Sequence, residues 1–408
     1  MENMEQKRNY IYTERAHLMC PDMHFGIVAK LNGTYQAEKV RAGLTALQQA
    51  HPFLRSVIGT EVCTEKLYYQ YKSDLQIPVT VAEEEEENWW QEAFTKISRR
   101  GWDVRREAML QVFVHPTGGE FSILMIAHHL LCDGRGLLQL VQEFAEYYIK
   151  GTKPETVEEC VIRSVEDLPA GSDLPFISRL VVKDANKKWA KEKQQVSYDS
   201  YASFERSYGA GHPVERIIQG VPGEDMIQIK EQCKKQGVSV NDYLIATMMQ
   251  KEDTNKVVIA ADIRNQVSCY RQGAMGNYAT AFGVTVKKKE SNLYDLARQV
   301  KAEVEKIRKQ PSREMLVLSC YLQMTPELID AVAISTLGTY QSKAARFVGD
   351  HMFGYGSQEG YSITNLGRIE SDVIAEASFI PPASPANRKT QGILTVNGKM
   401  AICSAIRK

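Results

Sequence analysis

The chain has 408 residues, enough for two hydrophobic cores of ordinary domain size. Its 50 Lys and Arg residues balance its 50 Asp and Glu residues, so no net positive field favours nucleic acid or an anionic membrane as the main partner. The composition, 43% hydrophobic and 25% charged, is typical of a globular protein and excludes a largely disordered chain.

The targeting and cysteine patterns predict a cytoplasmic protein. Residues 1–8 lack the apolar core of a signal peptide, and no apolar run approaches the length of a transmembrane segment. The eight cysteines are widely spaced and form no CxxC pair, which argues against a disulfide framework and against zinc. We also expect no metal and no permanently bound cofactor.

Hydrophobic periodicity predicts strands alternating with helices in the first part of the chain. In chain order, we expect a strand at 27–31, a helix at 37–50, strands at 53–58, 67–71 and 79–82, a hairpin of strands at 109–115 and 121–127, and an amphipathic helix after Gly134. The strand at 121–127 is apolar on both alternating faces, which is typical of a strand inside a sheet covered on both sides.

Residues 151–223 are polar and punctuated by Pro and Gly, with a basic helix-like piece at 183–193, which predicts a crossover between two lobes. Beyond it we expect helices at 225–236, 240–249 and 293–309, and strands at 256–261, 278–286, 360–364, 392–396 and 400–405. The pattern predicts an α/β protein with an N-terminal lobe at residues 1–160, and with the crossover segment and a C-terminal lobe at 161–408. Each lobe is expected to have a sheet covered by helices.

The strongest signal for chemistry is the segment HHLLCDG at residues 128–134. Histidine is scarce, with 8 in the chain. A match to HHxxxDG is therefore expected by chance on the order of once in a thousand such chains.

Strand geometry assigns different roles to the two histidines of this segment. Successive side chains on a strand point to opposite faces, so one imidazole is structural and the other is available. We choose His129 as a general base, since the pKa of histidine suits proton removal near neutral pH. The same geometry counts against a metal held by His128, His129 and Asp133. Asp133 is either a helix N-cap or a buried carboxylate that needs a cation, and Gly134 suits a close backbone approach.

A cysteine nucleophile is the rival chemistry in this segment. Cys132 would need a histidine on its own face and a lowered pKa, and no strong cue for the latter is present. A free cysteine of this kind is usually a small buried hydrophobic residue.

The HHLLCDG segment resembles the signature of the CoA-dependent acyltransferase superfamily. That group includes chloramphenicol acetyltransferase, condensation domains of nonribosomal peptide synthetases, polyketide-associated acyltransferases and alcohol acetyltransferases. Other segments are similar in order and spacing: HPFLR at 51–55, GVSVND at 237–242, ADIR at 261–264, GN at 276–277 and SITNLG at 362–367. The resemblance spans nearly the whole chain, and HHxxxDG is its only highly specific element.

The resemblance implies two chloramphenicol-acetyltransferase-like lobes with the active-site tunnel between them. His129 would deprotonate a hydroxyl or amine acceptor, which attacks the thioester of acyl-CoA or of acyl-pantetheine on a carrier protein. His128 and Gly134 would complete the motif, while Asp133 would pair with Arg264 and shape the site. Candidates for binding the oxyanion or substrate are Ser362, Thr364, Asn365 and Asn277, for which strand-end hydrogen bonding is an equally open role.

Two departures from the superfamily's motifs narrow the kind of member that we expect. The DFGWG motif of plant-type members has no counterpart, and residues 10–24 do not match the SxAQ motif of synthetase condensation domains. No carrier-protein segment is present either, which favours a stand-alone enzyme nearest to the alcohol acetyltransferase or polyketide-associated types. The alternative is a non-catalytic module that docks carrier proteins or partner enzymes.

Overall fold

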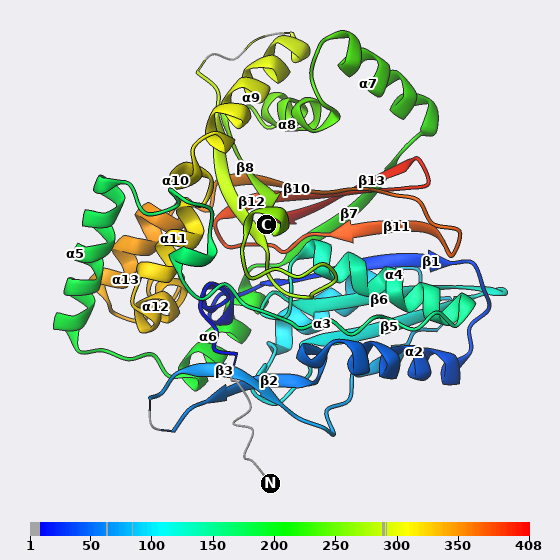
Figure 1. Ribbon diagram of the computed structural model, residues 1–408, viewed down its shortest axis with the longest axis horizontal. Coiled ribbons are helices and arrows are strands. Elements are labelled where there is room, and N and C mark those ends of the chain that lie inside the picture. Colours follow the sequence, from blue (N-terminus) through cyan, green and yellow to red (C-terminus); the bar gives the residue numbers. More distant parts are fainter. Residues whose placement is uncertain (1–8, 63, 84, 288–289, 291) are drawn as a thin grey trace.

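The computed structural model in Figure 1 describes residues 9–408 except residues 63, 84, 288–289 and 291. Residues 1–8, on which the signal-peptide expectation rests, lie outside the described residues. Cys63, one of the eight cysteines, also lies outside them. The described chain forms one five-stranded and one six-stranded sheet, with helices packed against both (Figure 1). The expected α/β class with two helix-covered sheets is confirmed.

The first sheet has the strand order β11-β1-β6-β5-β4 and is antiparallel except for the pair β4 and β5. Helices α2 and α4 pack against each other, with α4 against β1, and α3 contacts β5. A separate hairpin is formed by β2 and β3. The bounds of these elements are β1 His24–Leu31, α2 Ala37–Ala50, β2 Ser56–Thr60, β3 Leu67–Tyr71, β4 Val79–Val81, α3 Trp89–Arg100, β5 Leu110–Thr117, β6 Glu120–His128, α4 Gly134–Lys150 and β11 Ile374–Ile380.

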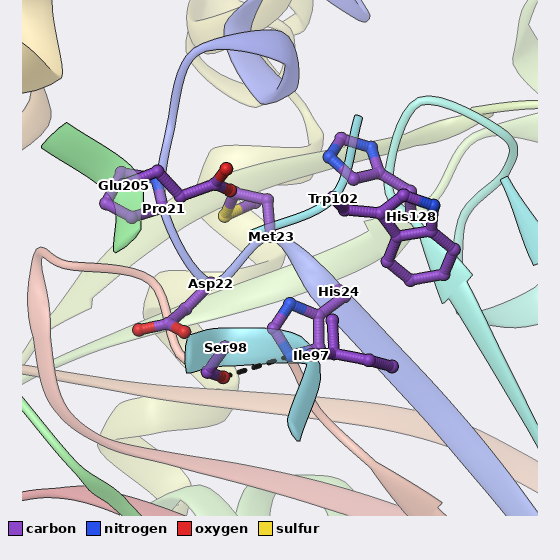
Figure 2. A pocket seen from close by; sticks show the side chains of 9 residues that line it. All are labelled: Pro21, Asp22, Met23, His24, Ile97, Ser98, Trp102, His128 and Glu205. Carbon is purple, nitrogen blue, oxygen red and sulfur yellow. Dashed lines mark hydrogen bonds between the residues drawn. The ribbon is translucent and has the colours of Figure 1, made fainter. Parts of the chain in front are cut away.

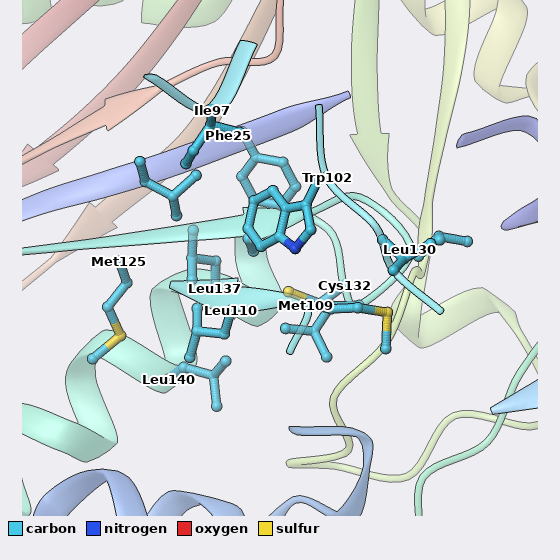
Figure 3. Packing of buried hydrophobic residues seen from close by; sticks show 14 of the residues in the cluster. Phe25, Ile97, Trp102, Met109, Leu110, Met125, Leu130, Cys132, Leu137 and Leu140 are labelled. Carbon is cyan, nitrogen blue, oxygen red and sulfur yellow. The ribbon is translucent and has the colours of Figure 1, made fainter. Parts of the chain in front are cut away.

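Strand β6 lies inside the first sheet and is buried on both faces, as its sequence predicted. Phe25 from β1 and Leu137 from α4 belong to the apolar cluster around it (Figure 3). The residues of β6 with no exposed surface are Phe121, Ile123, Leu124, Met125, Ile126 and Ala127. This close packing holds the C-terminal end of β6 in a fixed place.

The second sheet has the strand order β7-β13-β12-β10-β8-β9, in which β10 runs parallel to both β8 and β12. Helices α7, α8 and α9 lie together on one side of it (Figure 1). The bounds are β7 Val214–Val221, α7 Gly223–Lys235, α8 Val240–Lys251, β8 Lys256–Asp262, β9 Ala279–Thr285, α9 Leu293–Arg308, β10 Gly360–Ile369, β12 Asn387–Val396 and β13 Lys399–Arg407.

The remaining helices include a group in which α5, α11, α12 and α13 pack together, while α6 packs on α3. Their bounds are α1 Arg15–Leu18, α5 Phe176–Glu192, α6 Tyr198–Gly211, α10 Pro311–Glu314, α11 Leu316–Gln323, α12 Pro326–Leu337 and α13 Lys343–Val348. Within the described ranges, no single helix is long and apolar enough to cross a membrane, although α11 and α12, bent by 109° at their junction, pass that test as a pair.

The sheets do not follow the expected boundary at residue 160. Strand β11, at residues 374–380, pairs with β1 in the first sheet. An uncovered β1 edge would expose a row of unpaired backbone groups, and β11 satisfies them. The crossover at 151–223 contains α5, which overlaps the helix-like piece expected at 183–193, and it also contains α6 and β7, which were not expected.

Candidate functional site

The HHLLCDG segment forms a tight turn between β6 and α4. Strand β6 ends at His128, one residue beyond the expected strand at 121–127, and the backbone N–H of His129 donates to the Met23 carbonyl across 2.8 Å. Gly134 begins α4 where a Cβ atom would lie 2.8 Å from Leu366 Cδ2 and 3.2 Å from Phe379 Cζ. The glycine therefore lets the helix start against β10 and β11.

His128 is the structural member of the pair. Its Nδ1 accepts a hydrogen bond from the backbone N–H of Leu130 at 3.2 Å, and its ring meets Trp102 edge-on with centroids 5.8 Å apart. Burial, together with the neighbouring His24 and His129, lowers the pKa of His128 to about 3. His128, His24 and Trp102 line the same small pocket (Figure 2). The ring is thus neutral and committed to packing.

His129 has its tautomer set by Asn277. The Asn277 amide Nδ2 donates to the His129 carbonyl at 2.9 Å and lies 3.5 Å from the Leu130 carbonyl, which fixes which end of the amide is nitrogen. The Asn277 Oδ1 consequently faces the His129 Nδ1 at 3.0 Å. Since an amide oxygen only accepts, Nδ1 carries the proton and Nε2 keeps its lone pair.

The surroundings of His129 keep it neutral near pH 7. Burial lowers the pKa of His129 below its ordinary value of 6.5, although its own backbone, Asp133 and Asn277 act in the opposite direction. The Phe25 ring meets it edge-on with centroids 5.0 Å apart. A neutral imidazole with a free Nε2 lone pair is the form that a general base requires.

Asp133 joins the turn to the second sheet. Its Oδ1 accepts from the Gly136 N–H at 2.9 Å, which makes it the N-cap of α4, and its Oδ2 accepts from the Tyr278 N–H at 2.7 Å. Arg264 Nη2 donates to Oδ1 at 2.7 Å. Burial alone would raise the pKa of Asp133, but the Arg264 charge and these hydrogen bonds outweigh it and lower the pKa.

Arg264 is held between two carboxylates. It forms ion pairs with Asp133 at 2.7 Å and Asp262 at 3.0 Å, and its side chain is 10% exposed. The Asp133–Arg264 pair expected from the resemblance is therefore present, and Asp133 is both N-cap and ion-pair partner. Because Asp133 also binds Tyr278, the neighbour of Asn277, the pair holds Asn277 in place against His129.

The oxyanion candidates are not brought together at His129. Ser362 donates to Thr390 at 2.9 Å and accepts from Asn387 at 2.8 Å, within the second sheet. Asn365 lies 3.4 Å from Asn241 and accepts from the Gly367 N–H. Asn277, the fourth candidate, hydrogen-bonds to His129 and there orients the ring.

Thr364 is half-buried on β10, in register with Gly392. Strand β10 contacts α4, and its Leu366 lies beside Gly134, so Thr364 is on a strand of the second sheet that reaches the HHLLCDG turn.

Cys132 is fully buried, and burial raises the pKa of its thiol well above the ordinary value. A protonated buried thiol is a poor nucleophile, which agrees with the interpretation of Cys132 as a packing residue. In the part of the chain that the structure describes, no group of three His, Cys, Asp or Glu residues could hold a metal ion.

His17 is a residue at this site that sequence reasoning missed. Its ring stacks on His129, with centroids 4.0 Å apart and planes 19° apart. It belongs to α1, and no local pattern links it to the HHLLCDG segment. Only the tertiary structure brings the two rings together.

Comparison with known proteins supports the fold. No family model matches the chain. A curated relative, the probable nonribosomal peptide synthetase CymA from Salinispora arenicola, is 25% identical over 133 residues, which is 32% of this chain but 2% of that protein.

Solved structures match almost the whole chain, and three of them illustrate the likeness. Trichothecene 15-O-acetyltransferase from Fusarium sporotrichioides has a TM-score of 0.64 at 11% identity, over 98% of this chain and 90% of that one. The condensation domain of the polyketide synthase MokA has a TM-score of 0.61 at 10% identity, over 98% of this chain and 92% of that one. The epimerization domain of tyrocidine synthetase B has a TM-score of 0.56 at 15% identity, over 97% of this chain and 87% of that one. The chain therefore has the two-sheet, chloramphenicol-acetyltransferase-like fold of condensation domains and CoA-dependent acyltransferases.

Proposed function

We propose that this protein is an acyltransferase that moves an acyl group from a thioester to a hydroxyl acceptor or, less favoured, an amine. The observation that carries the proposal is the neutral His129, whose Nε2 lone pair is set by the Asn277 contact at Nδ1. The fold supports a transferase-type or condensation-like role.

The reaction follows from that tautomer. The acceptor X–H gives its proton to His129 Nε2 while the X lone pair bonds to the thioester carbonyl carbon. The carbonyl π electrons move to oxygen and form a tetrahedral oxyanion. When this collapses, the C–S bond breaks, its electron pair goes to sulfur, and the thiolate takes the proton from His129. The products are the acylated acceptor and a free thiol.

The other motif residues position His129 in this proposal. Asp133 and Arg264 tie α4 to the segment that carries Asn277, and they are too fully engaged to transfer protons. Thr364 is the side chain that we propose as the oxyanion donor from the second sheet. Ser362 is not proposed, because its hydroxyl already donates to Thr390.

The donor is acyl-CoA or an acyl group on carrier-protein pantetheine. Both present the same thioester to His129, so they differ only in what contacts the outer surface. Several solved neighbours are domains of nonribosomal peptide or polyketide synthases, which favours testing both donors.

The test is a thiol-release assay with acetyl-CoA, longer acyl-CoAs and acyl carrier proteins, each with panels of alcohols and amines. We expect turnover with at least one pair, and loss of it in His129→Ala. If no donor and acceptor pair gives more turnover than His129→Ala, the enzymatic proposal is wrong and the non-catalytic docking module takes its place.

A further inference from the structure

The stacking of His17 on His129 is enforced by the fold. Two residues before His17, Arg15 Nε donates to Asp330 Oδ1 on α12 at 2.8 Å, and Arg15 Nη2 pairs with the other carboxylate oxygen. These two side chains are 10% and 6% exposed, so the ion pair is nearly buried. An ion pair of this kind fixes α1 against α12 and thereby fixes where the His17 ring lies.

His17 completes the enclosure of the proposed base. One edge of the His129 ring is taken by Asn277 at Nδ1, and Phe25 lies edge-on against it. His17 covers a face of the ring at 4.0 Å. The ring is thus held in one plane, with Nε2 as the nitrogen left for a substrate.

We propose that His17 is a positioning residue for His129: it fixes the plane of that ring, shields one face from water, and stays neutral while His129 takes up the acceptor proton. This inference rests on the proposed function. It concerns a residue outside the HHxxxDG motif.

Electrostatics determine which ring of the pair takes the proton. Two parallel imidazoles at 4.0 Å repel each other strongly if both are charged, so the pair holds one proton at most near neutral pH. Burial lowers the pKa of His17 well below its ordinary value, and His129 and His128 lower it further. The charge of Asp133 favours a proton on His129 instead.

The neutral ring is also a suitable neighbour for the cation. An aromatic face attracts a positive charge that lies over it, and this attraction grows when water is excluded. His17 therefore supports the imidazolium that forms in the reaction. Its own Nδ1 is buried and has no hydrogen-bond partner among the described residues, so it is not oriented as a second base.

The direct test is a titration of the His129 imidazole by ¹⁵N NMR in the wild type, His17→Ala and His17→Phe. In His17→Ala water reaches the exposed face, and the pKa of His129 should rise towards 6.5. In His17→Phe the stack and the shielding persist, and the pKa should stay at the wild-type value. If His17→Ala does not fold, His17→Gln replaces it with the same expected shift.

A matched control is His212→Ala. His212 also stacks on an aromatic ring, that of Tyr208, with centroids 4.1 Å apart. The His212→Ala substitution should leave the titration of His129 unchanged. A folded His17→Ala protein with an unchanged His129 pKa would overturn the proposal, as would a shift in His17→Phe equal to that in His17→Ala.

Turnover provides a second readout. We expect kcat to fall roughly three- to tenfold in His17→Ala, the scale of one lost aromatic pair, and to stay within about threefold in His17→Phe. The titration needs no substrate, so it separates the two proposals. Absence of turnover in the wild type would reject the proposed function, whereas the His17 inference is accepted or rejected by the pKa alone.

Discussion

Replacing Asn277 with alanine should reduce turnover while leaving the fold intact. In the wild type the amide Oδ1 accepts from His129 Nδ1–H at 3.0 Å, and Nδ2 donates to the His129 carbonyl at 2.9 Å. Alanine removes both contacts. The tautomer that leaves the lone pair on Nε2 is then no longer favoured, and the ring is free to turn.

The size of the effect follows from the buried Nδ1–H. A buried donor left without a partner costs about 1–3 kcal/mol. At about 1.4 kcal/mol per tenfold in rate, the loss corresponds to a roughly 5- to 150-fold fall in kcat. Asn277→Asp should be no better, because its second carboxylate oxygen would face the His129 and Leu130 carbonyls.

The assay compares kcat for thiol release in Asn277→Ala with that in Asn186→Ala. Asn186 also bridges two backbone groups, the Gln323 carbonyl and the Thr325 N–H, each at 2.9 Å, without contact to His129. It reports the effect of losing a structural asparagine. A folded Asn277→Ala protein with kcat within twofold of the wild type would refute the reasoning.

Three further predictions test the surroundings of the base. Arg264→Met leaves the buried Asp133 carboxylate without its cation and should lower the free energy of unfolding in urea by about 3 kcal/mol. A decrease of less than about 1 kcal/mol would contradict the role of the ion pair. Cys132→Ala should retain turnover, since burial keeps the thiol protonated and therefore a poor nucleophile. Loss of turnover in a stable Cys132→Ala protein would indicate that the Cys132 thiol is the nucleophile. Because burial lowers the pKa of His129, the acid limb of kcat/KM should have its midpoint below pH 6.5; a midpoint at pH 7 or above would be inconsistent with this.

Elements with strong local patterns could be predicted from the sequence. Helix α2 was predicted with both ends correct because Val40, Leu44 and Leu47 form one buried stripe. Strand β6 was predicted because an uninterrupted apolar run needs cover on both faces. In both cases the residues that decide the structure lie within one element.

Elements that depend on distant partners were missed. Strand β11 adds to β1 from the far end of the chain, a pairing that no local pattern specifies. Strand β7 carries Glu215 and lies at the edge of the second sheet, where exposed polar residues hide the strand period.

The residues of the candidate site also fall into two groups: those located from the sequence, and those whose role depends on the tertiary structure. The motif located His129, and the resemblance located Arg264 and Asn277. The part that Asn277 plays in fixing the tautomer depends on which way its amide points, and the His17 stack depends on how α1 packs. Both are properties of the tertiary structure.

The most direct test of the central claim is the yield of acylated acceptor per thiol released, with the donor and acceptor pair that gives turnover. Mass spectrometry of the acceptor and a thiol assay on the same sample give both quantities. The account predicts one acylated acceptor per thiol in the wild type and neither product above background in His129→Ala. Acylated acceptor formed equally well by a folded His129→Ala protein would contradict it.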